Sequence, residues 1–286
     1  MKKQTWIYIA LILACIVAFN VYLKADSIFA DRKAPEILFS QELPELSVAD
    51  GDEALLQGVT ATDDRDGDVT ASIVVEKVRL DDTDGTITVT YAAFDKAGHV
   101  TKAQRQARYT DYESPRFSLS KSPIFIQNTG MDIFDVVTAV DLVEGDISHR
   151  IRVTSLDDSS LGAVGSHQVE LSVSNSLGET VKLAIPLEVN AAGSYSANVT
   201  LKEYLVYLSV GDEFNPKDYL QEYIRSGLAL SLTDKKLPKG YELKLDSNVD
   251  MENPGVYWVD YRVSETVSES GAVFTGMTRL IVVVEG

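Results

Sequence analysis

The sequence predicts an all-β protein in which three tandem β-sandwich domains follow an N-terminal transmembrane helix. Short segments in which apolar and polar residues alternate recur along the chain between Gly, Asp and Asn turns, a pattern typical of half-buried strands. A block of similar sequence also recurs, with Pro35 and Pro115 standing 80 residues apart. One long apolar run lies at the N-terminus.

Residues 1–24 are expected to form a cytoplasmic stub and a transmembrane signal anchor. The apolar run Trp6–Leu23 is interrupted only by Asn20. As a helix it would be about 27 Å long, which nearly matches a hydrocarbon core of about 30 Å. Lys2 and Lys3 precede the run and should stay in the cytoplasm, so the rest of the chain is expected outside.

Two other processing outcomes remain open for this segment. A secretory signal peptide would be cleaved near Ile28–Ala30, although the residues there fit a cleavage site poorly. The residues Leu11–Cys15 resemble a lipobox, which would place a lipid on Cys15. The apolar run continues after Cys15, where an acylated cysteine normally leads into a polar tether. We therefore predict an uncleaved, single-pass protein of the cell membrane, held through Trp6–Leu23, with its C-terminal part extracellular.

Composition excludes several classes of function. The 26 Lys and Arg residues are outnumbered by 43 Asp and Glu residues, and this net charge of −17 would repel nucleic-acid phosphates. The single cysteine rules out an intramolecular disulfide framework and a Cys-rich zinc site. Hydrophobic residues make up 45% and charged residues 24%, as in ordinary globular proteins, so extensive disorder is not expected.

Sequence repeats define the expected domains as residues 33–111, 113–190 and 196–286. The first two repeats match in order, and the third matches only through its glycine-led strand at Pro254–Val263. The matching pairs are Val59–Asp63 with Val137–Asp141, Gly67–Thr70 with Gly145–Ser148, and Asp95–Gly98 with Asn175–Gly178.

Each repeat contains a strand with one predicted inward face. In these strands every second residue after a glycine is apolar, with His167 as the exception. Because successive side chains of a strand point to opposite faces, these alternate residues share one face. The inward sets are Ile87, Val89, Tyr91 and Ala93, then His167, Val169, Leu171 and Val173, then Tyr257, Val259, Tyr261 and Val263. The segment Pro216–Ile224 has an i, i+3, i+4 apolar stripe behind a possible cap at Asn215, so it is expected to form a short helix.

Short strands and turns of this kind favour immunoglobulin-like β-sandwiches. The motifs between Ala34 and Gly98 resemble a bacterial immunoglobulin-like domain, a family that occurs in tandem on Gram-positive surface proteins and in some insecticidal crystal proteins. The resemblance is strong over residues 33–111, moderate over 113–189 and weak over 196–286. It implies a spacer or adhesive module, and the family offers no common catalytic residue to carry over.

An acidic run in the first repeat suggests a tentative Ca²⁺ site. Asp63, Asp64, Asp66 and Asp68 lie within six positions, and Ca²⁺ prefers several oxygen ligands on a flexible loop. The same residues suit a tight turn in which Asp and Thr oxygens accept backbone N–H groups, and this interpretation is favoured. Asp31 and Asp111, beside the domain junctions, could add ligands.

No enzyme is expected, because the sequence contains no nucleophile elbow or phosphate loop and its three histidines occupy unrelated repeat positions. No cofactor is expected apart from the possible structural calcium. We predict a membrane-anchored surface stalk, scaffold or adhesive module that contacts proteins or glycans. The alternative is an accessory subunit of an envelope complex or sensor with a ligand groove in domain 3. That domain is rich in aromatic residues: Tyr204, Tyr207, Tyr219, Tyr223, Tyr241 and Trp258.

Overall fold

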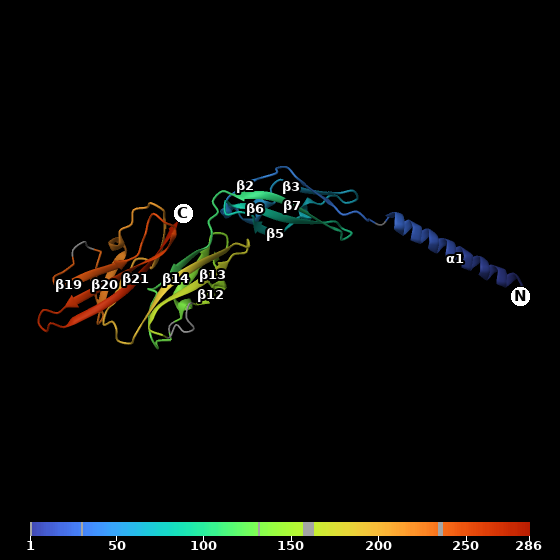
Figure 1. Cartoon of the computed structure of the whole chain (residues 1–286). Coiled ribbons are helices and arrows are strands. Elements are labelled where there is room, and N and C mark those ends of the chain that lie inside the picture. Colours follow the sequence, from blue (N-terminus) through green and yellow to red (C-terminus); the bar gives the residue numbers. More distant parts are fainter. Residues whose placement is uncertain (1, 30, 131, 157–162, 234–236) are drawn as a thin grey trace. The chain divides into compact units, whose positions relative to one another are not determined.

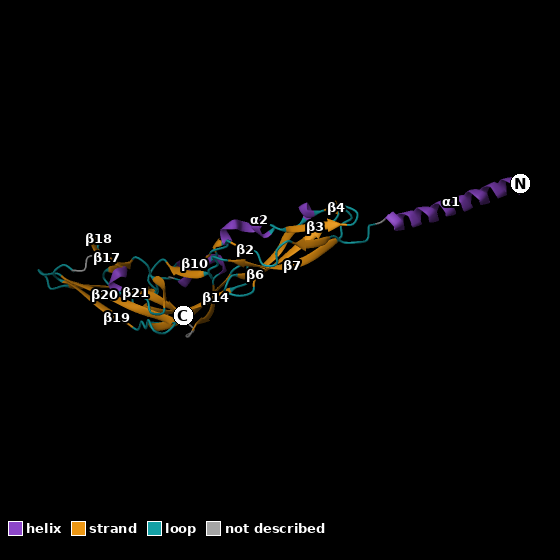
Figure 2. Cartoon of the chain, turned by 90° about the horizontal axis from the view of Figure 1, so that it is seen from above, coloured by secondary structure: helices purple, strands orange, loops and turns teal. Residues whose placement is uncertain are grey.

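The computed structural model describes residues 2–29, 31–130, 132–156, 163–233 and 237–286 (Figure 1). These residues form two compact units, Met1–Thr110 and Asp111–Gly286. Strands are the main secondary structure of the second unit and, outside helix α1, of the first, which confirms the all-β prediction (Figure 2). The domain boundaries at residues 33–111, 113–190 and 196–286 remain predictions.

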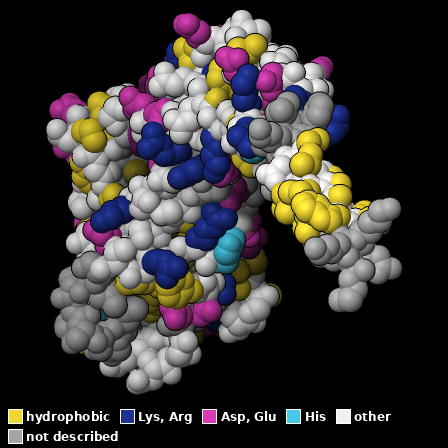
Figure 3. Space-filling view, turned by 90° about the vertical axis from the view of Figure 1, so that its right-hand side faces the viewer, with side chains coloured by type: hydrophobic (Ala, Val, Ile, Leu, Met, Phe, Trp, Pro, Cys, Tyr) yellow, Lys and Arg dark blue, Asp and Glu magenta, His cyan; other side chains and the backbone are white. Residues whose placement is uncertain are grey.

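The N-terminal apolar run forms helix α1 (Lys2–Phe29). Its apolar side chains from Trp6 to Tyr22 are exposed and form a hydrophobic surface along the helix (Figure 3). Within the described ranges, no helix has the length and apolarity needed to cross a membrane, so the predicted transmembrane span is not supported. Ala30, part of the alternative cleavage site, lies outside the described residues.

Two sheets form the sandwich of the first unit. One sheet has the order β1-β3-β4 and the other β2-β7-β6-β5. Their bounds are β1 Glu36–Phe39, β2 Glu45–Leu46, β3 Val59–Asp63, β4 Gly67–Asp68, β5 Val74–Leu80, β6 Thr86–Phe94 and β7 Val100–Tyr109. Neighbouring strands are antiparallel except β2 and β7, which are parallel. Short helices lie between strands at η1 Val48–Asp50, α2 Gly51–Leu55 and η2 Thr70–Ser72.

The predicted inward face of β6 is confirmed, since Ile87, Val89 and Tyr91 have no exposed surface. The ring of Tyr91 lies 5.5 Å from that of Phe39 on β1, so side chains of the two sheets meet in the core. This sandwich is consistent with the immunoglobulin-like fold that the sequence predicts.

The same pairing order occurs twice more in the second unit. The sheets β8-β10-β11 and β9-β14-β13-β12 come first in the chain, followed by β15-β17-β18 and β16-β21-β20-β19. In each case the second strand pairs in parallel with the last, as β9 does with β14 and β16 with β21. The bounds are β8 Arg116–Leu119, β9 Ile124–Ile126, β10 Val137–Asp141, β11 Gly145–Asp146, β12 Arg152–Leu156, β13 Gly165–Ser174 and β14 Thr180–Asn190. They continue with β15 Asn198–Leu201, β16 Leu205–Ser209, β17 Leu220–Arg225, β18 Leu228–Ser231, β19 Tyr241–Ser247, β20 Gly255–Thr266 and β21 Val273–Glu285. Short 3₁₀ helices are η3 Ile133–Asp135, η4 Ser148–Arg150 and η5 Pro216–Tyr219.

The helix predicted at Pro216–Ile224 is wrong beyond its first turn. Asn215 does cap η5 by accepting the Lys217 N–H, at 3.3 Å, but the chain then continues as β17. The register of β17 against β15 shifts by one residue, so Leu220 and Tyr223 are both buried although they are three residues apart. A bulge therefore produced the helix-like spacing in the sequence.

Candidate functional site

The acidic run of the first repeat folds as the tight turn between β3 and β4. Asp63 Oδ1 accepts the N–H groups of Arg65 and Asp66, at 2.8 and 2.9 Å. Thr70 Oγ1 accepts the N–H of Ala61 at 3.0 Å, which fastens the end of the turn to β3. Asp63 and Thr70 therefore satisfy backbone donors that the sheet leaves unpaired.

The second repeat builds the same turn between β10 and β11. Asp141 Oδ1 accepts the N–H groups of Val143 and Glu144, both at 2.9 Å, and Ser148 Oγ accepts the N–H of Ala139 at 3.0 Å. The two turns can therefore be compared residue by residue.

The four predicted Ca²⁺ ligands do not converge. Asp64 is ion-paired with Lys33 at 2.8 Å on the surface, and Asp68 Oδ1 accepts the N–H of Thr70 at 2.9 Å. Asp63 and Asp66 instead lie beside Asp31, which precedes β1, with one carboxylate oxygen of each within 4.8 Å of the other two.

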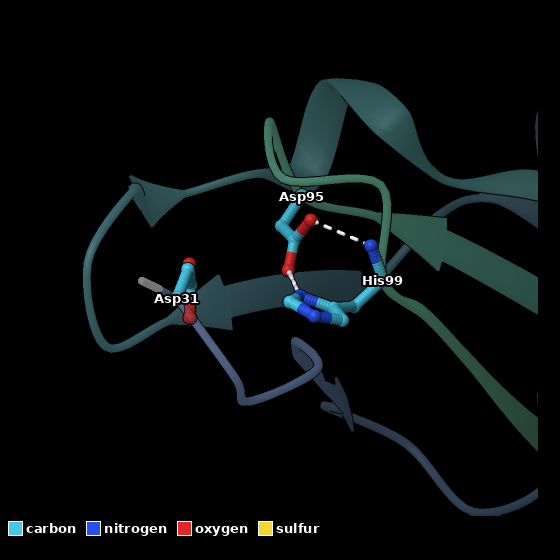
Figure 4. A group of neighbouring side chains, drawn as sticks. All are labelled: Asp31, Asp95 and His99. Atoms are coloured by element: carbon cyan, nitrogen blue, oxygen red, sulfur yellow. Dashed lines mark hydrogen bonds and ion pairs between the residues drawn. The ribbon is translucent and has the colours of Figure 1, made fainter. Parts of the chain in front are cut away.

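A second trio shares Asp31. One carboxylate oxygen of Asp31 and of Asp95 and one ring nitrogen of His99 also lie within 4.8 Å of one another (Figure 4). Asp95 follows β6 and His99 precedes β7. We refer to Asp31, Asp63, Asp66, Asp95 and His99 together as the Asp31 cluster.

Asp95 and His99 are tightly paired. Asp95 Oδ1 accepts the backbone N–H of His99 at 2.8 Å, and Oδ2 lies 2.7 Å from its ring Nδ1. Burial raises the pKa of Asp95, but these hydrogen bonds outweigh that effect and lower it overall. The Asp95 carboxylate in turn raises the pKa of His99.

Asp63 is held in its ionised form. The N–H groups of Asp66 and Arg65 lower the pKa of Asp63, while burial and the neighbouring Asp95 charge oppose them. Asp63 Oδ2 is buried and has no hydrogen-bond partner among the described residues. The cluster thus presents carboxylate oxygens that a hard cation could bind.

Asp31 was expected from the sequence as an added ligand, whereas Asp95 and His99 were not. A signal was available: Asp95 aligns with Asn175, so the first repeat has a carboxylate where the second has an amide. Asp111, the counterpart of Asp31, is in neither trio.

A separate cavity of about 850 Å³ lies in the third repeat. Its described lining combines charged groups, including Lys202, Lys217 and Asp218, with leucines such as Leu243 and Leu245. The aromatic residues expected there pack into or against the apolar clusters instead: Tyr204, Tyr207, Tyr219, Tyr223, Tyr241 and Trp258.

No family model matches the chain. An uncharacterized 81.3 kDa protein of Acholeplasma phage L2 is 27% identical over 179 residues, a match that covers 60% of this chain and 22% of the phage protein. Among solved structures, protocadherin gamma B2 extracellular cadherin domains 1–5 are 13% identical over 89% of this chain and 60% of theirs, with a TM-score of 0.20. The CBM51-2 and INT domains of Clostridium perfringens ZmpB are 16% identical over 88% of this chain and 42% of theirs, with a TM-score of 0.22. These structural similarities are too low to support an argument about function.

Proposed function

We propose that the chain is a non-catalytic scaffold of the cell surface, whose second and third sandwiches present protein- or glycan-contacting faces at a fixed spacing. The observation that carries the proposal is the packed joint between the second and third repeats. A rigid joint holds one domain at a set distance and orientation from the other, as a spacer requires.

The apolar part of this joint is continuous with a domain core. The buried cluster built around Phe117, Val169 and Leu187 of the second repeat also contains Leu205 and Ile281 of the third. The Phe117 N–H donates to the Tyr207 hydroxyl at 3.0 Å, which fixes β8 against β16. The two repeats therefore bury apolar surface together, which favours one relative position over many.

The polar part of the joint centres on Arg279 of β21, which is 5% exposed. Its guanidinium binds Asp260 on β20 through two contacts of 2.6 and 2.8 Å and lies 4.8 Å from the Trp258 ring centre. The guanidinium also donates to the Pro186 carbonyl at 3.4 Å, and the backbone N–H of Arg279 donates to Ser122 Oγ at 2.9 Å. A buried guanidinium tolerates little displacement from such partners, so the joint is geometrically specific.

Retention on envelope material tests the scaffold role. The full chain should bind saturably to intact bacterial cells or purified wall glycan and release no new product from the glycan. Failure to bind either material, or turnover of the glycan, would contradict the proposal.

The cavity in the third repeat supports a second candidate, an accessory subunit or sensor with a ligand groove. Its lysines and leucines suit a ligand with both anionic and apolar parts. Leu245→Arg would fill the cavity without altering the joint residues. Loss of wall-glycan retention in this variant, with an unchanged melting temperature, would favour this candidate over the scaffold.

We also propose that helix α1 keeps the chain at a membrane and that the β-sandwiches lie outside the cell. Side chains such as Trp6, Ile12 and Val17 expose apolar surface that lipid or protein contact would cover. Membrane fractionation with protease accessibility on whole cells tests this placement. Recovery of the full chain in the soluble fraction would contradict it.

A further inference from the structure

We propose that the Asp31 cluster binds a hard divalent cation of the Ca²⁺ class through Asp31, Asp63, Asp66 and Asp95. This ligand set differs from the run Asp63–Asp68, and the site is independent of the scaffold role. The cation would join the segment before β1 to the two turns that follow β3 and β6.

Burial makes the cluster more than a set of surface acids. Asp63 and Asp95 are each only 8% exposed. Both oxygens of Asp95 are engaged by His99, and Asp63 Oδ1 is engaged by two N–H groups, but Asp63 Oδ2 has no partner within the described structure. Leaving a buried carboxylate oxygen unpaired is costly, and a bound cation removes that cost.

The second repeat shows what normally occupies this position. There Asp141 Oδ2, the counterpart of Asp63 Oδ2, accepts a hydrogen bond from Asn175 Nδ2 at 3.0 Å. Asp95 stands at the position of Asn175 in the first repeat. An amide donor is thus replaced by a second carboxylate, and two neighbouring buried carboxylates repel unless a positive charge lies between them.

A second substitution removes a protein-borne positive charge. Glu144, the counterpart of Asp66, is bound by the Arg150 guanidinium at 2.5 and 3.0 Å. The position of Arg150 is occupied by Ser72 in the first repeat. Asp66 Oδ2 accepts the backbone N–H of Lys96 at 2.7 Å. The Lys96 ammonium lies 3.4 Å from Oδ1, but its side chain is 82% exposed, so water screens much of its charge. The second repeat therefore supplies its own donors, and the first lacks the matching amide and guanidinium.

The donor set selects the class of cation. The four ligands are all carboxylates, whose oxygens suit Ca²⁺ better than soft metals. His99 is paired through Nδ1 with Asp95, so we assign it the role of orienting that carboxylate rather than of a ligand. Asp31 adds a ligand from the segment that precedes β1.

Calorimetric titration of the full chain with CaCl₂ tests the site, with thermal unfolding as a second readout. Extracellular calcium modules have Kd values of about 10⁻⁴–10⁻³ M, and we expect a value in that range with a rise in melting temperature. Asp95→Asn recreates the pairing of the second repeat and should weaken binding by about 10-fold or more. The amide can donate to Asp63 Oδ2, but it gives up the carboxylate charge beside His99 Nδ1, so the calcium-free variant should melt close to the wild type.

Asp64→Asn is the matched control, since it removes one charge from the same turn but lies outside the cluster. It should change the Kd by less than about threefold, as expected for an exposed charge. The absence of heat and of a melting shift at about 10 mM Ca²⁺, well above the expected Kd, would overturn the proposal. Equal Ca²⁺ affinities of the wild type and Asp95→Asn would overturn it too. So would an equal loss of Ca²⁺ affinity in Asp64→Asn and Asp95→Asn. A Zn²⁺ affinity that exceeds that for Ca²⁺ and disappears in His99→Gln would overturn the oxygen-only ligand set.

Discussion

Removal of the Arg279 charge should weaken the joint between the second and third repeats. Arg279→Met keeps an unbranched apolar side chain beside Trp258 but leaves Asp260 without its guanidinium partner. Both side chains are largely buried, at 6% and 12% exposure, so screening by water is weak. Breaking such a pair on one side costs about 3–5 kcal/mol of unfolding free energy.

The double variant Arg279→Met with Asp260→Leu separates two contributions to the unfolding free energy: the cost of leaving Asp260 unpaired and the net contribution of the ion pair. Because the buried Arg279–Asp260 pair is absent as a whole, most of the lost stability should return, to within about 1 kcal/mol of the wild type. Glu188, whose carboxylate lies 3.9 Å from the Arg279 guanidinium, is 21% exposed and keeps water as a partner. The predicted order of stability is therefore wild type and double variant together, with the single variant well below them.

Urea unfolding followed by Trp258 fluorescence measures these differences. The chain has two tryptophans, so Trp6→Phe in every variant leaves Trp258 as the reporter beside Arg279. A loss below about 1 kcal/mol in Arg279→Met would mean that Arg279 and Asp260 behave as an exposed ion pair, which contradicts a buried joint. A double variant as unstable as the single one would refute it equally.

Two further predictions concern the first sandwich and pH. Val89→Asp places an unpaired charge where no surface is exposed, so it should lower the unfolding free energy of the first sandwich by about 4 kcal/mol or more. The urea midpoint of the unfolding transition reported by Trp258 should stay unchanged. Circular dichroism and Trp258 fluorescence on one urea series measure the two transitions, and an equal shift of both would contradict separate folding. Arg225, 2.6 Å away, holds the pKa of Glu265 below its usual value, so the unfolded chain binds this proton more tightly. The stability gained from this pair should be complete above the unfolded pKa of about 4.3 and be lost as pH falls through the lower folded value. Melting temperatures between about pH 6 and 3 should therefore fall less in Glu265→Gln than in the wild type, and parallel curves would contradict this.

Strand faces were predictable from the sequence because alternation is local. Val89, Leu171 and Tyr261 were assigned to inward faces, and all three are fully buried. The bulge in β17 was not predictable in this way, since it depends on pairing with β15, and the extra residue imitates a helical stripe.

The candidate site was only partly predictable for a related reason. Asp63 and Asp66 were named from their spacing, but in a turn neighbouring side chains diverge, and Asp64 points to Lys33 instead. Asp95 reaches the cluster from the opposite sheet, 32 positions further along the chain, so proximity in sequence gave no indication of it. Comparison of Asp95 with Asn175 would have been the informative signal.

If the second and third repeats act as one rigid scaffold, the distance between them has a single value, which a measured distance distribution reveals. Spin labels at Leu142→Cys and Leu228→Cys, both exposed positions, report on the two repeats in a Cys15→Ser background that removes the native thiol. Pulsed electron spin resonance on the full chain should give a single narrow distribution that broadens in Arg279→Met. A wild-type distribution as broad as that of the variant would contradict the rigid joint and the scaffold built on it.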